Sequence, residues 1–109
     1  MKPIYHLVPA NIWQASTGPT YSAASLASEG FIHFSFADQV AAAADRFYAD
    51  QQDMLVLHLD PSRLTSPVRE EPSGTGEIFP HIYGPINRDA VVSVQSLQRG
   101  ADGRWQFSP

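Results

Sequence analysis

Met54-Leu-Val-Leu-His-Leu59 is a strongly apolar stretch that Asp60-Pro61 brings to an end. Its length and composition are typical of a strand in the interior of a β-sheet. His58 alternates with Val56 along this stretch and has no polar motif around it. We therefore interpret His58 as a structural histidine and expect a sheet built around residues 54–59.

Both strands and helices are predicted on the N-terminal side of this stretch. Alternating residues predict strands at 4–8 and 31–35, and short helices are expected at 11–16 and at 22–29, the second closed by Gly30. Apolar positions at helical spacing predict a helix over 38–48. Ser35, three residues before Asp38, matches a capping pattern, so we expect it mainly to cap this helix and secondarily to contact a ligand.

Strands dominate on the C-terminal side. Residues 68–71 and 78–83 are predicted to be extended, with Pro80 favouring an edge or irregular strand, and residues 71–76 are expected to form a loop. Residues 91–97 predict another strand, and Gly100-Ala-Asp-Gly103 supplies turn residues for a hairpin that returns through 104–107. Helices that cluster early and strands that cluster late favour an α+β fold.

The composition limits the fold and excludes several function classes. A chain of 109 residues with 43% hydrophobic residues can bury one core, which predicts one domain over 1–109. The net charge of -4, with scattered basic residues, offers no basic surface for duplex nucleic acid. The absence of cysteine excludes disulfides, thiolate ligands and cysteine nucleophiles. No apolar stretch approaches the roughly 20 residues that span a bilayer, and the N-terminus lacks a signal-peptide run, so we expect a cytoplasmic protein without a membrane partner.

Three of the four histidines lie within short apolar runs bordered by turn residues: His6, His33 and His81. An imidazole titrates near neutrality and can donate, accept, bind a metal or transfer a proton, so three of them in the apolar framework predict a site. Each one alone is more often an ordinary packed, hydrogen-bonded histidine. If the strands of His6 and His33 are neighbours, their imidazoles can converge.

Charged and aromatic side chains near His81 extend the candidate site. Glu70 and Glu71 follow Arg69 in an extended segment and point to opposite sides, so only one can face a given cleft. Such a carboxylate can orient an imidazole, hold a ribose hydroxyl or stabilise positive charge, while a solvated pair with Arg69 is the alternative. Proline and glycine restrict the backbone around His81 and Tyr83, which suits ligand binding but also suits a stiff turn.

Other kinds of site have less support. Three histidines and a carboxylate suit zinc or iron, although no two of them have the close spacing of a helical ligand pair. A serine hydrolase is disfavoured because no Gly-x-Ser-x-Gly motif occurs. Gly74-Thr-Gly76 is too short to indicate a phosphate-binding loop.

Several blocks of the chain form a recognisable series: Ile4-Tyr-His-Leu7, Tyr21 with Ser25-Leu26, Glu29-Gly-Phe-Ile-His-Phe-Ser35, Arg69 to Glu71, and Phe79-Pro-His-Ile-Tyr-Gly-Pro-Ile86. They resemble the successive motifs of the bacterial domain of unknown function 952 family. The resemblance covers nearly the whole chain. That family is grouped by fold with the ADP-ribosyltransferases, so the resemblance implies a split β-sheet that binds NAD in a central cleft. It implies this fold more firmly than any activity.

The beginning of the chain is similar to the RNA 2'-phosphotransferase branch of that superfamily. In that branch a histidine on the first strand precedes a glycine-led strand that ends in a His-x-Ser-like element, and His6 and residues 30–35 match this order. The resemblance implies that His6 bonds the nicotinamide-side ribose or the amide region and that His33 lines the same cleft. The arginines of the phosphotransferase and the late glutamate of the toxin and polymerase branches have no clear match.

These residues and the resemblance together predict an NAD-binding protein of ADP-ribosyltransferase-like fold. If the protein is active, the reaction that the resemblance implies is cleavage of the nicotinamide glycosidic bond with transfer of ADP-ribose. The predicted catalytic residues are Glu71, His33 and His81. The predicted cofactor-binding residues are His6, His33, Ser35, Arg69 and Tyr83, and the predicted partner is NAD or a related nucleotide. Two alternatives stay open: a nucleotide or small-metabolite binding module without chemistry, and a histidine-ligated metal enzyme.

Overall fold

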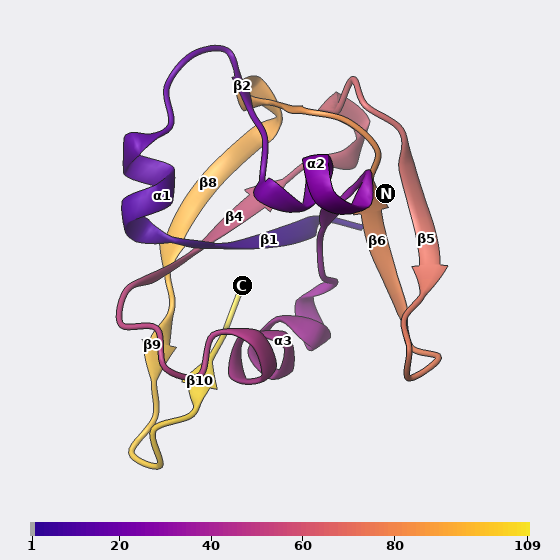
Figure 1. Cartoon of the computed structure of the whole chain (residues 1–109). Helices are drawn as coiled ribbons and strands as arrows, with labels where there is room; N and C mark the ends of the chain where they lie inside the picture. The colour runs from indigo at the N-terminus through magenta and orange to yellow at the C-terminus, as the bar shows by residue number, and fades with distance from the viewer. Residues whose placement is uncertain (1) are drawn as a thin grey trace.

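Two antiparallel three-stranded sheets carry the fold in the computed structural model, which describes residues 2–109 (Figure 1). The first sheet has the order β1-β4-β8 and is made of β1 (Ile4–Pro9), β4 (Met54–Leu59) and β8 (Val91–Ser96). The second sheet has the order β3-β6-β5 and is made of β3 (Ile32–His33), β6 (Ile78–Ile82) and β5 (Val68–Pro72).

Short helices and small ladders connect the two sheets. The α-helices are α1 (Ala10–Ala15), α2 (Ala24–Glu29) and α3 (Val40–Phe47), and the 3-10 turns are η1 (Ala37–Gln39), η2 (Pro61–Arg63) and η3 (Arg88–Ala90). The ladders pair β2 (Thr20–Tyr21) with β7 (Ile86–Asn87), and β9 (Gln98–Arg99) with β10 (Trp105–Gln106). The predicted α+β class is confirmed. Within residues 2–109, none of the helices has the length and apolar character that crossing a membrane requires.

The middle position of β4 explains its uninterrupted apolar sequence. Leu57 and Leu59 point into a cluster that includes Ile32 and Ile82 of the second sheet, whereas Val56 points to the opposite side, toward α3. Successive side chains of a strand face opposite sides, so a strand buried on both sides must be apolar at every position except one that finds a polar partner. His58 is that exception, because its Nε2 lies 2.9 Å from Gln95 Oε1 on β8.

Pro80 explains why β3 is shorter than the strand predicted at 31–35. β6 is the middle strand of its sheet, so the predicted edge position of Pro80 is wrong, while the predicted irregularity is present. The Phe34 amide donates to the Pro80 carbonyl at 3.1 Å, but Pro80 has no N–H to complete the pair. The ladder therefore ends after His33, and the chain turns toward β1.

Ser35 pairs with β1 instead of capping the helix. Its amide donates to the Tyr5 carbonyl at 2.8 Å, and the Tyr5 amide donates to the Ser35 carbonyl at 2.9 Å, which joins the two sheets. The helical segment begins with η1, whose N-cap residue is Phe36, and the Phe36 amide donates to Gln39 Oε1 at 2.9 Å. The predicted capping role of Ser35 is therefore wrong, because the bridge to Tyr5 takes its backbone and Gln39 closes the start of η1.

The loop predicted at 71–76 begins later than expected. β5 continues through Glu71 and Pro72, which pair with Phe79 and Ile78. The turn proper starts at Ser73, whose amide donates to the Glu77 carbonyl at 2.8 Å. Glu71 thus belongs to a regular strand, and its side chain has a fixed direction relative to the neighbours on β6.

Gly84 should not tolerate a side chain. A Cβ atom at this position would overlap the Ser66 hydroxyl, which donates to the Pro85 carbonyl at 2.7 Å. We expect Gly84→Ala to lower the free energy of unfolding by about 1–3 kcal/mol because the overlap forces a backbone shift. Gly74→Ala is the matched control, since nothing lies within 4 Å of its added Cβ. Urea unfolding of both variants checks this, and equal stabilities would contradict it.

Candidate functional site

One row of side chains crosses the second sheet. His33 on β3 lies directly opposite His81 on β6, and Arg69 on β5 lies directly opposite His81 on its other side. Residues directly opposite each other in a ladder share a face, so these three side chains lie on the same face of the sheet. The His33 and His81 rings meet edge to face with centroids 5.4 Å apart. We call His33, His81 and Arg69 the cationic row, after the guanidinium of Arg69.

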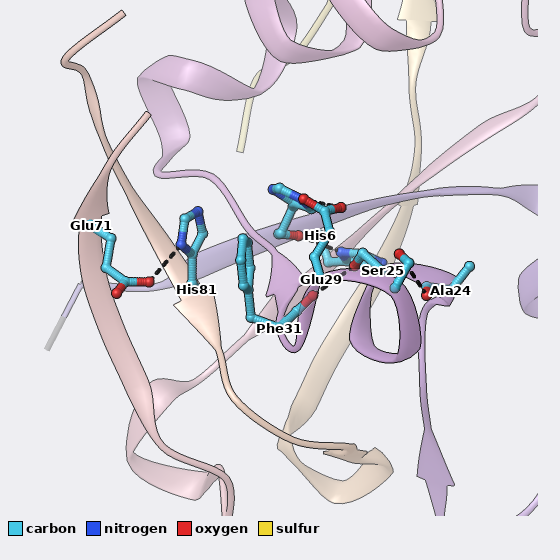
Figure 2. Close-up of polar contacts among 9 residues, drawn as sticks. His6, Ala24, Ser25, Glu29, Phe31, Glu71 and His81 are labelled. Atoms are coloured by element: carbon cyan, nitrogen blue, oxygen red, sulfur yellow. Dashed lines mark hydrogen bonds and ion pairs between the residues drawn. The ribbon is translucent and has the colours of Figure 1, made fainter. Parts of the chain in front are cut away.

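Glu71 and Tyr83 hold His81 in place. His81 Nδ1 lies 2.8 Å from Glu71 Oε1, and a dashed line marks this contact in Figure 2. The Tyr83 hydroxyl donates to the same oxygen at 2.6 Å. The hydrogen bond from Tyr83 and then that from His81 hold the pKa of Glu71 below its ordinary value. The same hydrogen bond raises the pKa of the Tyr83 phenol, because ionisation would remove the donated proton. Glu71 is therefore a carboxylate at neutral pH.

The tautomer of the neutral His81 ring follows from this contact. An ionised carboxylate can only accept, so Nδ1 of His81 carries the proton that is shared with Glu71. In the neutral ring the Nε2 atom then holds the free lone pair. A carboxylate that orients an imidazole in this way leaves Nε2 able to accept a proton from a bound group.

Aromatic rings fix the orientation of the row. The Phe31 ring stacks on the His81 ring with centroids 4.1 Å apart and an interplanar angle of 22°, and its centroid lies 4.8 Å from that of His33. The Arg69 guanidinium lies 4.8 Å from the centroid of Tyr83. The His81 side chain keeps only 10% of its surface exposed, while that of Glu71 keeps 33%. A ligand on this face would therefore reach Glu71 more easily than His81.

His33 is the most exposed histidine of the row. Its side chain is 55% exposed, and its Nε2 lies 3.1 Å from Oε2 of Glu29, the last residue of α2. Ion pairs exposed to this degree contribute little to stability because solvent screens them. His33 can therefore exchange Glu29 for a ligand group at small cost.

His6 lies behind the row and is buried. Its Nδ1 lies 2.7 Å from the His33 carbonyl oxygen, which can only accept, so Nδ1 carries the proton. Its Nε2 faces the Tyr21 hydroxyl at 3.4 Å, and its ring packs against Phe34. Burial lowers the pKa of His6 to about 4, so the ring is neutral at pH 7. Burial also raises the pKa of Tyr21 to about 12.

The structure brings most of the predicted site residues together. Glu71, His81, Tyr83, Arg69 and His33 share one face, whereas the predicted meeting of His6 with His33 runs through the His33 backbone carbonyl instead of the two rings. Ser35 is buried at 5% exposure and connects through its backbone to β1.

Sequence reasoning assigned no site role to Phe31, Glu29 or Tyr21. Phe31 could have been found, because it alternates with His33 on the same strand face. Glu29 could not, because its contact with His33 depends on the turn at Gly30, which adopts φ 89°. Tyr21 comes from β2, whose place beside His6 is a matter of tertiary packing.

Within residues 2–109, the cationic row coincides neither with a cluster of metal-binding side chains nor with either of two surface hollows. Nowhere in residues 2–109 do three His, Asp or Glu side chains group so that they could hold a metal ion, so the histidine-ligated metal enzyme has no support from the geometry. One surface hollow of about 530 Å³ lies between α3 and the C-terminal hairpin, and another of about 770 Å³ lies at the start of β4. Neither hollow is lined by a histidine. The cationic row lies outside both.

Fold and site together define a small α+β protein that presents a carboxylate–histidine pair on an antiparallel sheet. The family model described as "Protein of unknown function (DUF952)" matches residues 7–94. The chain belongs to this family, as its motifs predict. No curated protein shows a significant match to the chain.

Solved structures of CC0527 from Caulobacter crescentus are similar over nearly the whole chain. The crystal structure is 27% identical with a TM-score of 0.85, and the match covers 96% of this chain and 94% of that chain. The solution NMR structure is 28% identical with a TM-score of 0.82, and the match covers 97% of this chain and 93% of that chain. These similarities support the observed fold and name no activity.

Proposed function

We propose that this protein binds NAD or a related nucleotide over the cationic row and, through Glu71, cleaves the nicotinamide glycosidic bond. The observation that carries this proposal is the ionised Glu71 carboxylate, held by His81 and Tyr83 on a face lined with aromatic rings. Nucleotide phosphates carry negative charge that a guanidinium such as Arg69 attracts, and planar rings pack on aromatic side chains. The family resemblance to ADP-ribosyltransferases and the division into two antiparallel sheets support the same proposal.

The reaction breaks the bond between C1 of the ribose and the nicotinamide nitrogen. The bonding electron pair leaves with nicotinamide, the ribose develops oxocarbenium character, and an acceptor oxygen bonds to C1 and loses its proton. Both hydrogen bonds to Glu71 fall on Oε1, so within residues 2–109 the Oε2 atom has no hydrogen-bond partner. We assign Oε2 to the developing positive charge and Nε2 of His81 to the proton of the acceptor, which is water in the glycohydrolase form.

A binding module without chemistry is the second candidate. The observation that favours it is the engagement of Glu71 by two neighbours, which makes the carboxylate a structural support of His81 and Tyr83. Such a module binds NAD or another nucleotide saturably and releases no nicotinamide.

Isothermal titration of the full chain with NAD tests the proposal. We expect saturable binding by the wild type and at least roughly tenfold weaker binding by His33→Ala, which removes about 1.4 kcal/mol or more of contact with the ligand. His33→Ala should fold normally, because its side chain is 55% exposed. His58→Gln is the matched control, since it changes a histidine that pairs with Gln95 on the other sheet.

Each result of the titration leads to a different conclusion. Equal binding by His33→Ala and the wild type would show that NAD does not bind at the cationic row. The absence of heat at two temperatures would overturn NAD binding, because a single temperature can fall where the enthalpy is zero. A chromatographic assay of nicotinamide release then separates the enzyme from the binding module.

A further inference from the structure

Two arginines of the chain stack on tryptophans, and their surroundings differ. The Arg99 guanidinium lies 3.8 Å from the centroid of Trp105, and it donates to the backbone carbonyls of Gly103, Ala49 and Gln51. Both terminal nitrogens of that guanidinium thus donate to the chain. Arg99 has a structural role that needs no further partner.

Arg88 lacks such partners. Its guanidinium lies 4.4 Å from the centroid of Trp13, and Nη2 donates to Ser16 Oγ at 2.7 Å. Its Nε is buried and has no hydrogen-bond partner within the part of the chain that the structure describes. None of the ion pairs formed by residues 2–109 includes Arg88. The neighbouring Asp89 instead accepts a hydrogen bond from Asn87.

An unsatisfied donor on a charged group is costly, and a guanidinium cannot lose its proton to relieve the cost. The chain nevertheless holds Arg88 firmly, since its amide donates to the Pro19 carbonyl at 3.0 Å and its side chain rests on Trp13. The residue as a whole is only partly buried, and within residues 2–109 Nε is its one donor that is both buried and unpaired, so a group from solvent approaches the guanidinium at its Nη1 end. A fork of N–H donors fixed in this way matches two oxygens of an oxyanion.

We propose that Arg88, supported by Trp13 and Ser16, binds an oxyanion group of a ligand, either a phosphate or a carboxylate. This site is separate from the cationic row. Buried Tyr21 lies between Trp13 and His6, with ring centroids 5.4 Å and 5.7 Å away, and His6 in turn contacts the backbone of His33. The inference does not depend on NAD binding.

NMR of the arginine Nε–H groups in the full, ¹⁵N-labelled chain tests this site. Inorganic phosphate and acetate are titrated separately, with chloride adjusted to keep the ionic strength constant. We expect a saturable shift of the Arg88 Nε–H signal with at least one of them, while the signal of Arg99 stays in place. Arg88→Lys identifies the signal by its loss, and this variant should bind at least roughly tenfold more weakly because lysine lacks the planar fork.

The outcomes separate the possible ligands. A response to phosphate alone assigns the site to phosphorylated ligands, and a response to acetate alone assigns it to carboxylates. The proposal is overturned if Arg88 shows no saturable shift or if Arg99 shifts equally. It is also overturned if only Arg69 responds, because the oxyanion then binds at the cationic row. The comparison of Arg88 with Arg99 uses the wild type alone, so it stands even if Arg88→Lys fails to fold.

Discussion

The free energy of unfolding should fall by roughly 2–3 kcal/mol when the pH is lowered from 8 to 4.5, because His6 is buried as a neutral ring. Burial lowers the pKa of His6 from 6.5 to about 4 in the folded protein. At a pH between these two pKa values, His6 is protonated in the unfolded chain but stays neutral in the folded protein. The stabilisation from the neutral ring is therefore fully present above pH 6.5 and is lost as the pH falls toward about 4.

The control for this effect is His6→Asn. The asparagine side-chain amide can still donate to the His33 carbonyl, but it does not titrate, so the pH dependence of this variant should be flatter above pH 4.5. The carboxylate of Glu71 does not interfere in that range, because its pKa is lowered from 4.5 and its contribution is lost only below that value. Urea unfolding at a series of pH values measures both proteins. The same slope in both would show that His6 is not the titrating group.

Under the proposed function, replacing Glu71 with glutamine should lower the rate of nicotinamide release on the order of a hundredfold or more. Glutamine has nearly the same size and can still accept from Tyr83, but it cannot stabilise positive charge on the ribose as a carboxylate does. Steady-state release of nicotinamide from NAD measures the effect. A rate equal to that of the wild type would remove Glu71 from the reaction.

The chain offers a matched control in Glu70→Gln. Glu70 is the preceding residue of β5, so its side chain points to the other face, and this variant should keep the full rate. A second measurement does not depend on activity. The Glu71 carboxylate raises the pKa of Tyr83, so Glu71→Gln should lower that pKa in an ultraviolet titration, while Glu70→Gln should leave it unchanged. If the Tyr83 pKa falls and the rate does not, Glu71 supports its neighbours without taking part in the chemistry.

Local patterns predicted most elements of the fold. The apolar stretch at 54–59 predicted the inner strand of the first sheet, and Gly30 predicted the end of α2, which it closes with φ 89°. The predictions were wrong where a distant segment decides the outcome. Ser35 has the right spacing for a cap, but its backbone pairs with Tyr5, thirty residues away.

Alternation along strands predicted part of the candidate site. It placed Glu70 and Glu71 on opposite faces of their strand. Register between strands cannot be obtained in this way, since nothing local places His81 opposite both His33 and Arg69. The unpaired Nε of Arg88 could not be predicted either, because the lack of a hydrogen-bond partner depends on the tertiary structure around it.

The backbone carbonyl and the side chain of His33 lie in two different environments. Its carbonyl accepts a hydrogen bond from His6 in the interior, while its imidazole lies at the surface next to His81. A ligand that pulls the His33 backbone must stretch this hydrogen bond inside the core, whereas a proton taken up by His6 goes to Nε2, which faces Tyr21. The core of this protein and its exposed face are therefore coupled through this hydrogen bond, and a change at His6 or His33 affects both.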